Sequence, residues 1–413
     1  LEGKIAFYPT ILSLVGVIFG FFMYYLEDLG ISKYFIEHVP WLVINNADTA
    51  RTILTTFLAG VISIMVFSFS MVMLLLNQAS SNFSPRVIPG IISNRRHQFI
   101  LGIFNASLFY FIITLIVIKP TNDTYQLPGF SVILAIIFMA FCLSAFIYFI
   151  HSISQEIQVN RIINKIYMQV ENRLTYIISI EKDMFPNFPN SDDWITYNCK
   201  KSAYLQDFTL SNINEILKKE DVKAEILQIK GMFVLKDSPL FKVSKKLNGE
   251  SIKKIYDSCH FGTSEIVEDN YVLGFKQITE IAMKAMSPGI NDPGTAINAI
   301  DYLTQLFILR MQKLDNSYYF HEGITRIHIK TTSFRNILFY VMAMFRTYTK
   351  HDIVIVEKLF YMLKSLFNYG HCVDKEYKTA VSEEINNLYT DAMYELKNDM
   401  DIKRIKLLKE SIT

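Results

Sequence analysis

Residues 52–85 read TILTTFLAGVISIMVFSFSMVMLLLNQASSNFSP and contain no Asp, Glu, Lys or Arg. A helix needs about 20 mostly apolar residues to cross the hydrocarbon core of a bilayer, so this segment is long enough to span a membrane. Polar residues recur in it at intervals of seven, at Thr56, Ser63, Ser70 and Asn77. Because a seven-residue step returns a helix to nearly the same angle, these four side chains are predicted to share one helix face.

Three other uncharged segments of spanning length lie near this one. We predict membrane spans at 5–26, 51–77, 99–118 and 130–150. Residues 1–153 contain 7 Lys or Arg and 6 Asp or Glu, whereas the rest of the chain contains 34 and 33. The first 153 residues are therefore predicted to form a four-helix transmembrane domain, and the remainder is large enough to bury a core of its own.

The polar face of the second span has two interpretations. On a pore lining, its hydroxyl and amide groups would face water, and the apolar residues between them would form constrictions that gate by dewetting. On a packing surface, the same small and hydroxylated residues would let helices approach closely, and Gly60 would lie on that surface too. The candidate pore-lining residues are Thr56, Ser63, Phe67, Ser70, Leu74 and Asn77.

The loop between the second and third spans is the most basic connection in the membrane part. It contains Arg86, Arg95 and Arg96, which are candidates for a pore mouth, for contacts with anionic lipid headgroups, or for docking onto the C-terminal region. Short loops rich in Lys and Arg stay on the cytoplasmic side. With four spans, both termini are then predicted to be cytoplasmic.

Small residues in the first span favour a helix contact. Gly16 and Gly20 form a small-xxx-small pattern, with Ser13 about one turn earlier. Such patterns are typical of closely packed membrane helices.

The centres of the four spans contain no Asp, Glu, Lys or Arg. This argues against a proton-coupled transporter, whose relays use ionisable intramembrane residues.

The C-terminal region is predicted to contain a helical stalk at 154–182, an α+β domain at 183–332 and a helical region at 333–413. Residues 202–208 (SAYLQDF) and 323–330 (GITRIHIK) alternate apolar and polar side chains, which favours strands. The predicted fold is thus mainly α, with four transmembrane helices and a cytoplasmic α+β domain.

Residues 286–296 (MSPGINDPGTA) separate two predicted helices. Asn291 or Asp292 suits the N-cap of the second helix, and Pro293 suits its first position. The alternative is an ion or ligand site, because helix N-termini attract anions and Asp292 is a possible cation ligand.

Familiar catalytic signatures are missing from the sequence. It contains no phosphate-binding glycine loop, nucleophile elbow or H-E-x-x-H motif, so an enzyme is not expected. Cys259-His260 and His371-Cys372 lack the paired ligand spacing of a zinc site. We predict no metal and no cofactor.

The nearly balanced charge of the C-terminal region gives no electrostatic reason to expect nucleic acid as a partner.

Two separated motifs resemble the bacterial membrane-protein family of domain of unknown function 2254. They are NQASSNFSPRVIPG at 77–90 and IAMKAMSPGINDPGTAINAIDYL at 281–303. The resemblance covers nearly the whole chain. It implies a multi-pass protein of the bacterial inner (plasma) membrane with a cytoplasmic domain.

Two functions remain open at this stage. The first is a homo-oligomeric ion channel, in which the second span lines the pore and the C-terminal domain assembles or regulates it. Its partners would be the lipid bilayer, other copies of the chain and inorganic ions. The alternative is a non-conducting sensor or scaffold whose C-terminal domain binds a small ligand or a partner. The two differ in whether the Thr56–Asn77 face is covered by another helix of the same chain.

Overall fold

The computed structural model describes residues 7–39, 44, 46–82, 95–118, 128–156, 158–181, 188–263 and 270–412. The chain divides into two compact units, Leu1–Gln158 and Val159–Thr413.

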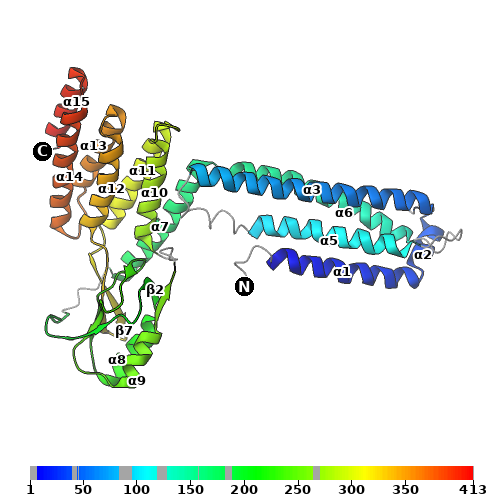
Figure 1. Cartoon of the computed structure of the whole chain (residues 1–413), viewed down its shortest axis with the longest axis horizontal. Helices are drawn as coiled ribbons and strands as arrows, with labels where there is room; N and C mark the ends of the chain where they lie inside the picture. The colour runs from blue at the N-terminus through cyan, green and yellow to red at the C-terminus, as the bar shows by residue number, and fades with distance from the viewer. Residues whose placement is uncertain are drawn as a thin grey trace. The chain divides into compact units, whose positions relative to one another are not determined.

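The N-terminal unit is built from long helices that run side by side (Figure 1). Four of its described helices are long and apolar enough to cross a membrane, and they coincide with the four predicted spans. The helix containing the polar face has 36 residues, or about 54 Å at 1.5 Å per residue, which exceeds a hydrocarbon core of about 30 Å. The helices are α1 (Phe7–Asp28), α2 (Ile31–His38), α3 (Ala47–Asn82), α5 (Arg95–Val117) and α6 (Gly129–Glu156).

Glycines bring α1 and α5 into backbone contact. A Cβ added at Gly16 would lie 2.5 Å from the backbone of Ala106, and one at Gly20 would lie 2.7 Å from the Ile113 side chain. The predicted small-residue contact is therefore confirmed, and its partner is in the same chain. Gly60 was predicted to share the face of Thr56, Ser63 and Ser70, as part of a helix-packing surface. That expectation is wrong, because its Cβ position faces Met139 of α6.

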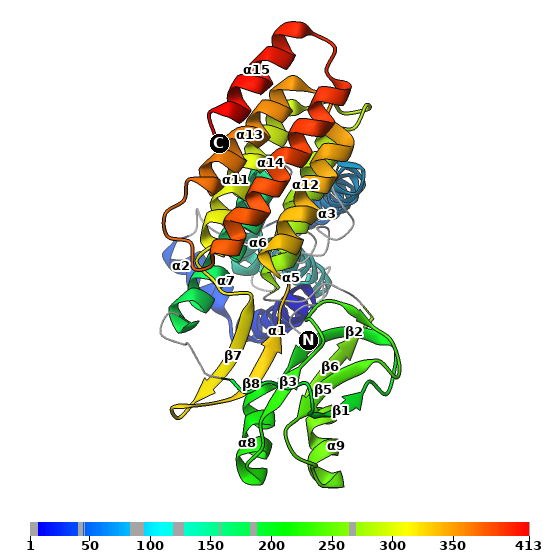
Figure 2. The ribbon, with the colours of Figure 1, turned by 90° about the vertical axis from the view of Figure 1, so that its left-hand side faces the viewer.

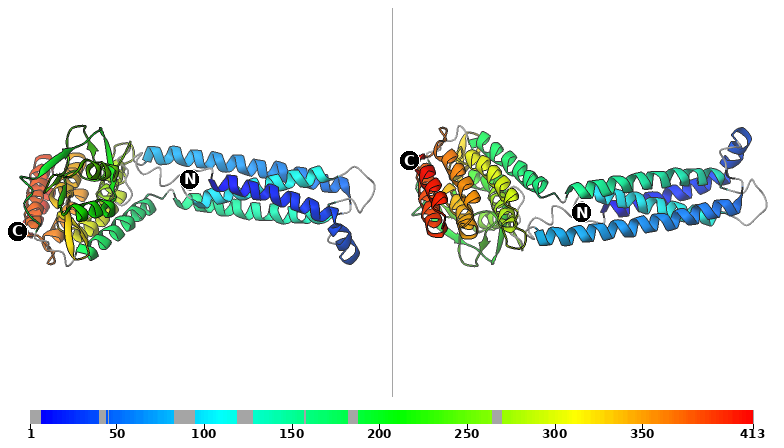
Figure 3. Two further views of the ribbon diagram at one scale, coloured as in Figure 1. Left: turned by 90° about the horizontal axis from the view of Figure 1, so that it is seen from below. Right: turned by 90° about the horizontal axis from the view of Figure 1, so that it is seen from above.

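One end of this unit is tied together by the carboxylate of Glu27, at the end of α1. It accepts hydrogen bonds from the backbone N–H and the hydroxyl of Ser131 on α6, at 2.8 and 2.6 Å, and from the Ser32 hydroxyl of α2. The Ser32 oxygen in turn accepts from the Phe130 N–H at 3.0 Å. Figure 3 shows α2 turning away from the direction of the long helices at this end.

The C-terminal unit combines two small sheets with a group of helices (Figure 2). The five-stranded sheet has the order β1-β5-β3-β8-β7, with β3 and β8 parallel and its other neighbours antiparallel. The three-stranded sheet has the order β4-β2-β6. The strands predicted from SAYLQDF and GITRIHIK are confirmed as β2 and β8. The strands are β1 (Ile195–Asn198), β2 (Ala203–Phe208), β3 (Ala224–Ile226), β4 (Phe233–Val234), β5 (Pro239–Val243), β6 (Cys259–Gly262), β7 (Asn316–His321) and β8 (Ile324–Lys330).

The helices of this unit pack mainly on one another. Most of the region predicted as a helical stalk forms one helix of this unit, which begins at Val159, whereas α6 ends at Glu156. This new helix packs closely on its unit, because a Cβ at Gly274 would lie 2.0 Å from the Val170 side chain. The helices are α7 (Val159–Glu181), α8 (Leu210–Glu220), α9 (Gly249–Asp257), α10 (Tyr271–Ala285), α11 (Pro293–Arg310), α12 (Phe334–Thr349), α13 (Ile353–Phe367), α14 (Lys375–Glu395) and α15 (Asp399–Glu410).

A buried cation joins the helices to the sheet. Arg310 at the end of α11 is fully buried, and its guanidinium donates to the carbonyls of Lys313 (2.7 Å) and Thr332 (3.1 Å) and to the Asp315 carboxylate. The Tyr377 hydroxyl of α14 donates to the same Lys313 carbonyl at 2.9 Å. This cluster was not predicted from the sequence, and its signal there is weak, because only Arg310 lies in α11 and the other members come from separate segments.

A second buried cation lies beside the first. The Lys313 ammonium is 3.2 Å from the Glu181 carboxylate of α7 and donates to the Ser317 hydroxyl at 2.9 Å. Burial, together with the nearby Arg310 charge, lowers the pKa of Lys313 to about 8, although the attraction of Glu181 and Asp315 opposes the shift. The cluster thus holds a lysine whose charge is costly in the folded chain.

Substituting Gly16 by Ala is expected to destabilise the N-terminal unit. The new methyl group would overlap the Ala106 backbone, and overpacking of this kind costs about 1–3 kcal/mol. Gly60→Ala is the matched control, because its methyl group meets only the flexible end of Met139 at 3.3 Å and Ala is a better helix former. Thermal unfolding in detergent checks this. Equal midpoints for both variants would contradict the close α1–α5 contact.

The stability of the C-terminal unit is expected to rise between pH 8 and pH 10. Lys313 has a folded-state pKa of about 8, below its ordinary value, so in this range the unfolded chain binds more protons. The gain is about 2–3 kcal/mol. Above pH 10 it is opposed by Tyr377, whose pKa burial raises. Urea unfolding followed by Trp194 fluorescence, in a Trp41→Phe background, measures this rise. The rise should vanish in Lys313→Met, and an unchanged pH profile there would refute the assignment.

Candidate functional site

The two sides of α3 have opposite environments. One side packs into the N-terminal unit and buries Leu54, Val61, Ser68 and Leu75. The other side is exposed along the length of the helix. The exposed residues include all six predicted pore-lining positions, which are Thr56, Ser63, Phe67, Ser70, Leu74 and Asn77. The structure therefore brings them together on one outer face, which we call the α3 outer face.

The hydroxyls of this face donate to their own helix. Thr56, Ser63 and Ser70 donate to the carbonyls four residues earlier, at 2.7, 2.9 and 3.0 Å. Their donors are thereby satisfied, and their oxygen lone pairs remain available toward the outside. Such side chains are tolerated next to lipid, and they also offer acceptors to water, to a cation or to another helix.

Besides the six predicted positions, the large apolar residues Ile62, Val66, Phe69 and Met73 are exposed on α3. Near the start of the helix, the small residues Thr52, Thr55 and Ala59 are exposed too, and they extend the α3 outer face. Together with Thr56 and Ser63, they give this half of α3 a surface of small side chains, which permits close approach of another helix. Their i, i+3, i+4 and i+7 spacing was the available signal.

The apolar positions on the α3 outer face have different neighbours. Phe67 is 48% exposed, and its ring centroid lies 5.8 Å from that of Phe146 on α6. It therefore sits at the border between the outer face and α6. Leu74 is 60% exposed and lies on the open part of the face.

The predicted basic residues are only partly described. Arg86 lies outside the described residues, and Arg95 begins α5 with a side chain that is also outside them. Arg96 is exposed and lines a cavity of about 830 Å³ between α1, α5 and α6. No residue of α3 lines this cavity, so it is separate from the α3 outer face.

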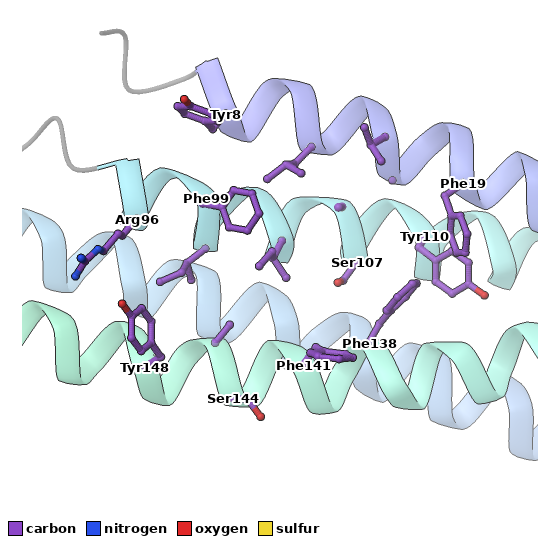
Figure 4. Close-up of a pocket in the computed structure, with 17 residues that line it drawn as sticks. Tyr8, Phe19, Arg96, Phe99, Ser107, Tyr110, Phe138, Phe141, Ser144 and Tyr148 are labelled. Carbon is purple, nitrogen blue, oxygen red and sulfur yellow. The ribbon is translucent and has the colours of Figure 1, made fainter. Parts of the chain in front are cut away.

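The α1–α5–α6 cavity is apolar and is closed at one end by aromatic rings. The ring centroid of Tyr110 lies 5.6 Å from that of Phe19 and 4.9 Å from that of Phe138. The Tyr110 hydroxyl donates to the Ser131 carbonyl at 2.9 Å, which connects this floor to the Glu27 contacts. Figure 4 shows Arg96 at the opposite end of the cavity from the three rings.

The loop before α11 forms a helix cap. The Asp292 carboxylate accepts from the Thr295 N–H at 3.1 Å and from the Thr295 hydroxyl at 2.6 Å, and Pro293 is the first residue of the helix. Asn291 has a positive φ of 49°. The capping role predicted for Asp292 is confirmed. An ion or ligand at Asn291 and Asp292 stays a prediction.

A smaller cavity of about 230 Å³ lies in the C-terminal unit, between residues 229–232 and the starts of α10 and α12. Its polar lining includes Lys276, Asn336 and Lys230, which pairs with Asp207 at 2.9 Å. Within the ranges that the structure describes, no group of three or more His, Cys, Asp or Glu is arranged to hold a metal ion.

The chain belongs to the family described as "Predicted membrane protein (DUF2254)", whose family model matches residues 2–365. It is also similar to uncharacterized proteins of Mycobacterium bovis and Mycobacterium tuberculosis. Each is 22% identical over 372 residues, which cover 85% of this chain and 70% of the relative. No solved structure matches the chain.

Removing the Asp292 cap is expected to destabilise α11. Asp292→Ala loses both bonds to Thr295, and such caps are worth about 1 kcal/mol. Asn291→Gly is the control, because glycine accepts the positive φ at this position. Urea unfolding with and without Mg²⁺ or Ca²⁺ measures both effects. A cation-dependent stabilisation that Asp292→Ala abolishes would instead indicate an ion site.

Proposed function

We propose that this member of the family is a homo-oligomeric channel of the bacterial inner membrane, in which α3 outer faces from several copies surround an ion pathway. The observation that carries the proposal is the exposure of the hydroxyl-bearing face of α3, while the opposite face is buried in its own bundle. No other described helix of the chain covers Thr56, Ser63 or Ser70. Several copies are needed because one chain presents only one such helix.

The chemistry of the α3 outer face suits a narrow ion path. Rings of Ser63 and Ser70 would present oxygen acceptors, because their hydroxyl protons are already donated within the helix. Acceptor oxygens replace part of the hydration shell of a cation, so we expect cations to be conducted better than anions. Phe67 and Leu74, one turn above and below Ser70, would form the apolar constrictions of the gate.

The proposed channel also has a defined orientation in the membrane. The loop that contains Arg86, Arg95 and Arg96 would be cytoplasmic under the positive-inside bias, and so would both termini. The C-terminal unit then acts as the assembly or regulatory domain of the channel.

A second candidate function is a non-conducting sensor. The observation that favours it is the 230 Å³ cavity of the C-terminal unit, which places Lys276 and Asn336 among apolar side chains. Pockets with a few polar groups in an apolar lining are typical ligand sites. In this case the α3 outer faces would associate without leaving a water-filled path.

Cysteine cross-linking tests whether the α3 outer faces meet. In a Cys372→Ser background, whose other cysteines are buried, Ser70→Cys is expected to form disulfide-linked dimers on mild oxidation in membranes. Ser68→Cys is the matched control, because Ser68 is fully buried against its own chain. Equal cross-linking of the two variants, or none for Ser70→Cys, would exclude a shared α3 interface.

Planar-bilayer recording of the purified chain tests conduction. We expect cation currents that Ser70→Leu reduces by tenfold or more, because leucines at this position in every copy remove the acceptors between the two constrictions. Ile147→Leu on the exposed side of α6 should leave the currents unchanged. Protein that cross-links through Ser70→Cys but carries no current would refute the channel proposal and favour the sensor.

A further inference from the structure

We propose that the α1–α5–α6 cavity is a binding groove for an anionic phospholipid, with one acyl chain inside the cavity and the phosphate at Arg96. The proposal rests on the geometry of this cavity and does not depend on channel activity, because the cavity and the α3 outer face share no residue.

The cavity is open to the side and closed at its inner end. Val15, Phe99 and Phe141 line it, yet they are 52%, 51% and 63% exposed. In a bilayer, the medium that reaches such an opening is the acyl chains of neighbouring lipids. The Tyr110 and Phe138 rings close the inner end (Figure 4), so an entering chain has a defined limit.

The length of the cavity matches one leaflet. Arg96 and Tyr110 are fourteen residues apart on α5, which corresponds to about 21 Å along the helix. Half of a hydrocarbon core of about 30 Å, together with the headgroup region, spans a similar distance. With Arg96 at headgroup level, the aromatic floor lies near the middle of the bilayer.

The polar groups of the cavity gather at its mouth. Arg96 lies there with Tyr148 of α6 and Tyr8 of α1 nearby (Figure 4). A guanidinium matches the geometry of a phosphate, and tyrosines favour the interface between headgroups and hydrocarbon. Deeper in the cavity the hydroxyls are those of Ser107, Ser144 and Tyr110, so water would find few of the two to four partners that it needs.

The apolar lining favours an acyl chain as the occupant of the cavity. The cavity holds about 830 Å³. A flexible hydrocarbon chain fills such a narrow apolar space without burying polar groups against it.

Lipid titration of the purified, delipidated full chain tests the proposal by native mass spectrometry. The probes are phosphatidylglycerol and phosphatidylcholine with identical acyl chains. The native chain should bind phosphatidylglycerol more tightly. Arg96→Gln should weaken phosphatidylglycerol about fivefold, the effect of one arginine near anionic headgroups, and should weaken phosphatidylcholine less, because its choline group offsets the charge of its phosphate. Arg51→Gln removes a charge from the other end of the membrane helices and should change neither affinity.

A second pair of variants tests the acyl-chain part. Ala145→Trp places a large ring in the cavity and should weaken both lipids tenfold or more, whereas Ile147→Trp on the exposed side of α6 should not. Thermal unfolding midpoints verify that the variants are folded. Equal binding of the two lipids to the native chain, or an unchanged affinity in Arg96→Gln, would overturn the proposal. Unchanged lipid binding in Ala145→Trp with an altered oligomeric state would instead assign the cavity to a contact between copies.

Discussion

The contact between Gly16 and Ala106 determines how the membrane helices are arranged. With no side chain at Gly16, α1 lies directly on the backbone of α5, and Gly20 continues the contact toward Ile113. α5 is the most buried of the four spans and also packs against α3 and α6. Because α1 follows α5 so closely, a space remains between α1 and α6 that their side chains do not fill. The α1–α5–α6 cavity is a consequence of this packing.

The position of α5 also leaves α3 with one covered side. Leu54, Val61 and Leu75 turn toward the bundle, so the seven-residue series from Thr56 to Asn77 must turn away from it. Intrahelical hydrogen bonds make this arrangement compatible with a membrane, because no hydroxyl donor of the series is left unsatisfied. The same bonds leave the hydroxyl lone pairs pointing outward. The α3 outer face can therefore offer hydrogen-bond acceptors without an unsatisfied donor.

In the C-terminal unit, two buried cations hold the elements together, whereas in the N-terminal unit a glycine contact does so. Arg310 and Lys313 lie one turn apart and are almost fully buried. Their hydrogen bonds reach α7 through Glu181, the segment before α12 through Thr332, and α14 through Tyr377. Elements that are distant in the sequence are thereby held to one another, since removing the Glu181 or Asp315 carboxylate would leave a buried charge uncompensated.

The sequence by itself determined the four spans, the period of the α3 outer face and a helix cap at Asn291 or Asp292. These features follow from local rules: a backbone in hydrocarbon must be helical, a seven-residue repeat keeps one face, and a helix start needs an acceptor. Only the tertiary structure decided that this face is uncovered, that Gly60 turns toward α6, that the last span ends before α7, and that Arg310 and Lys313 share a buried cluster. Each of these depends on contacts between residues far apart in the chain, which periodicity and composition do not encode.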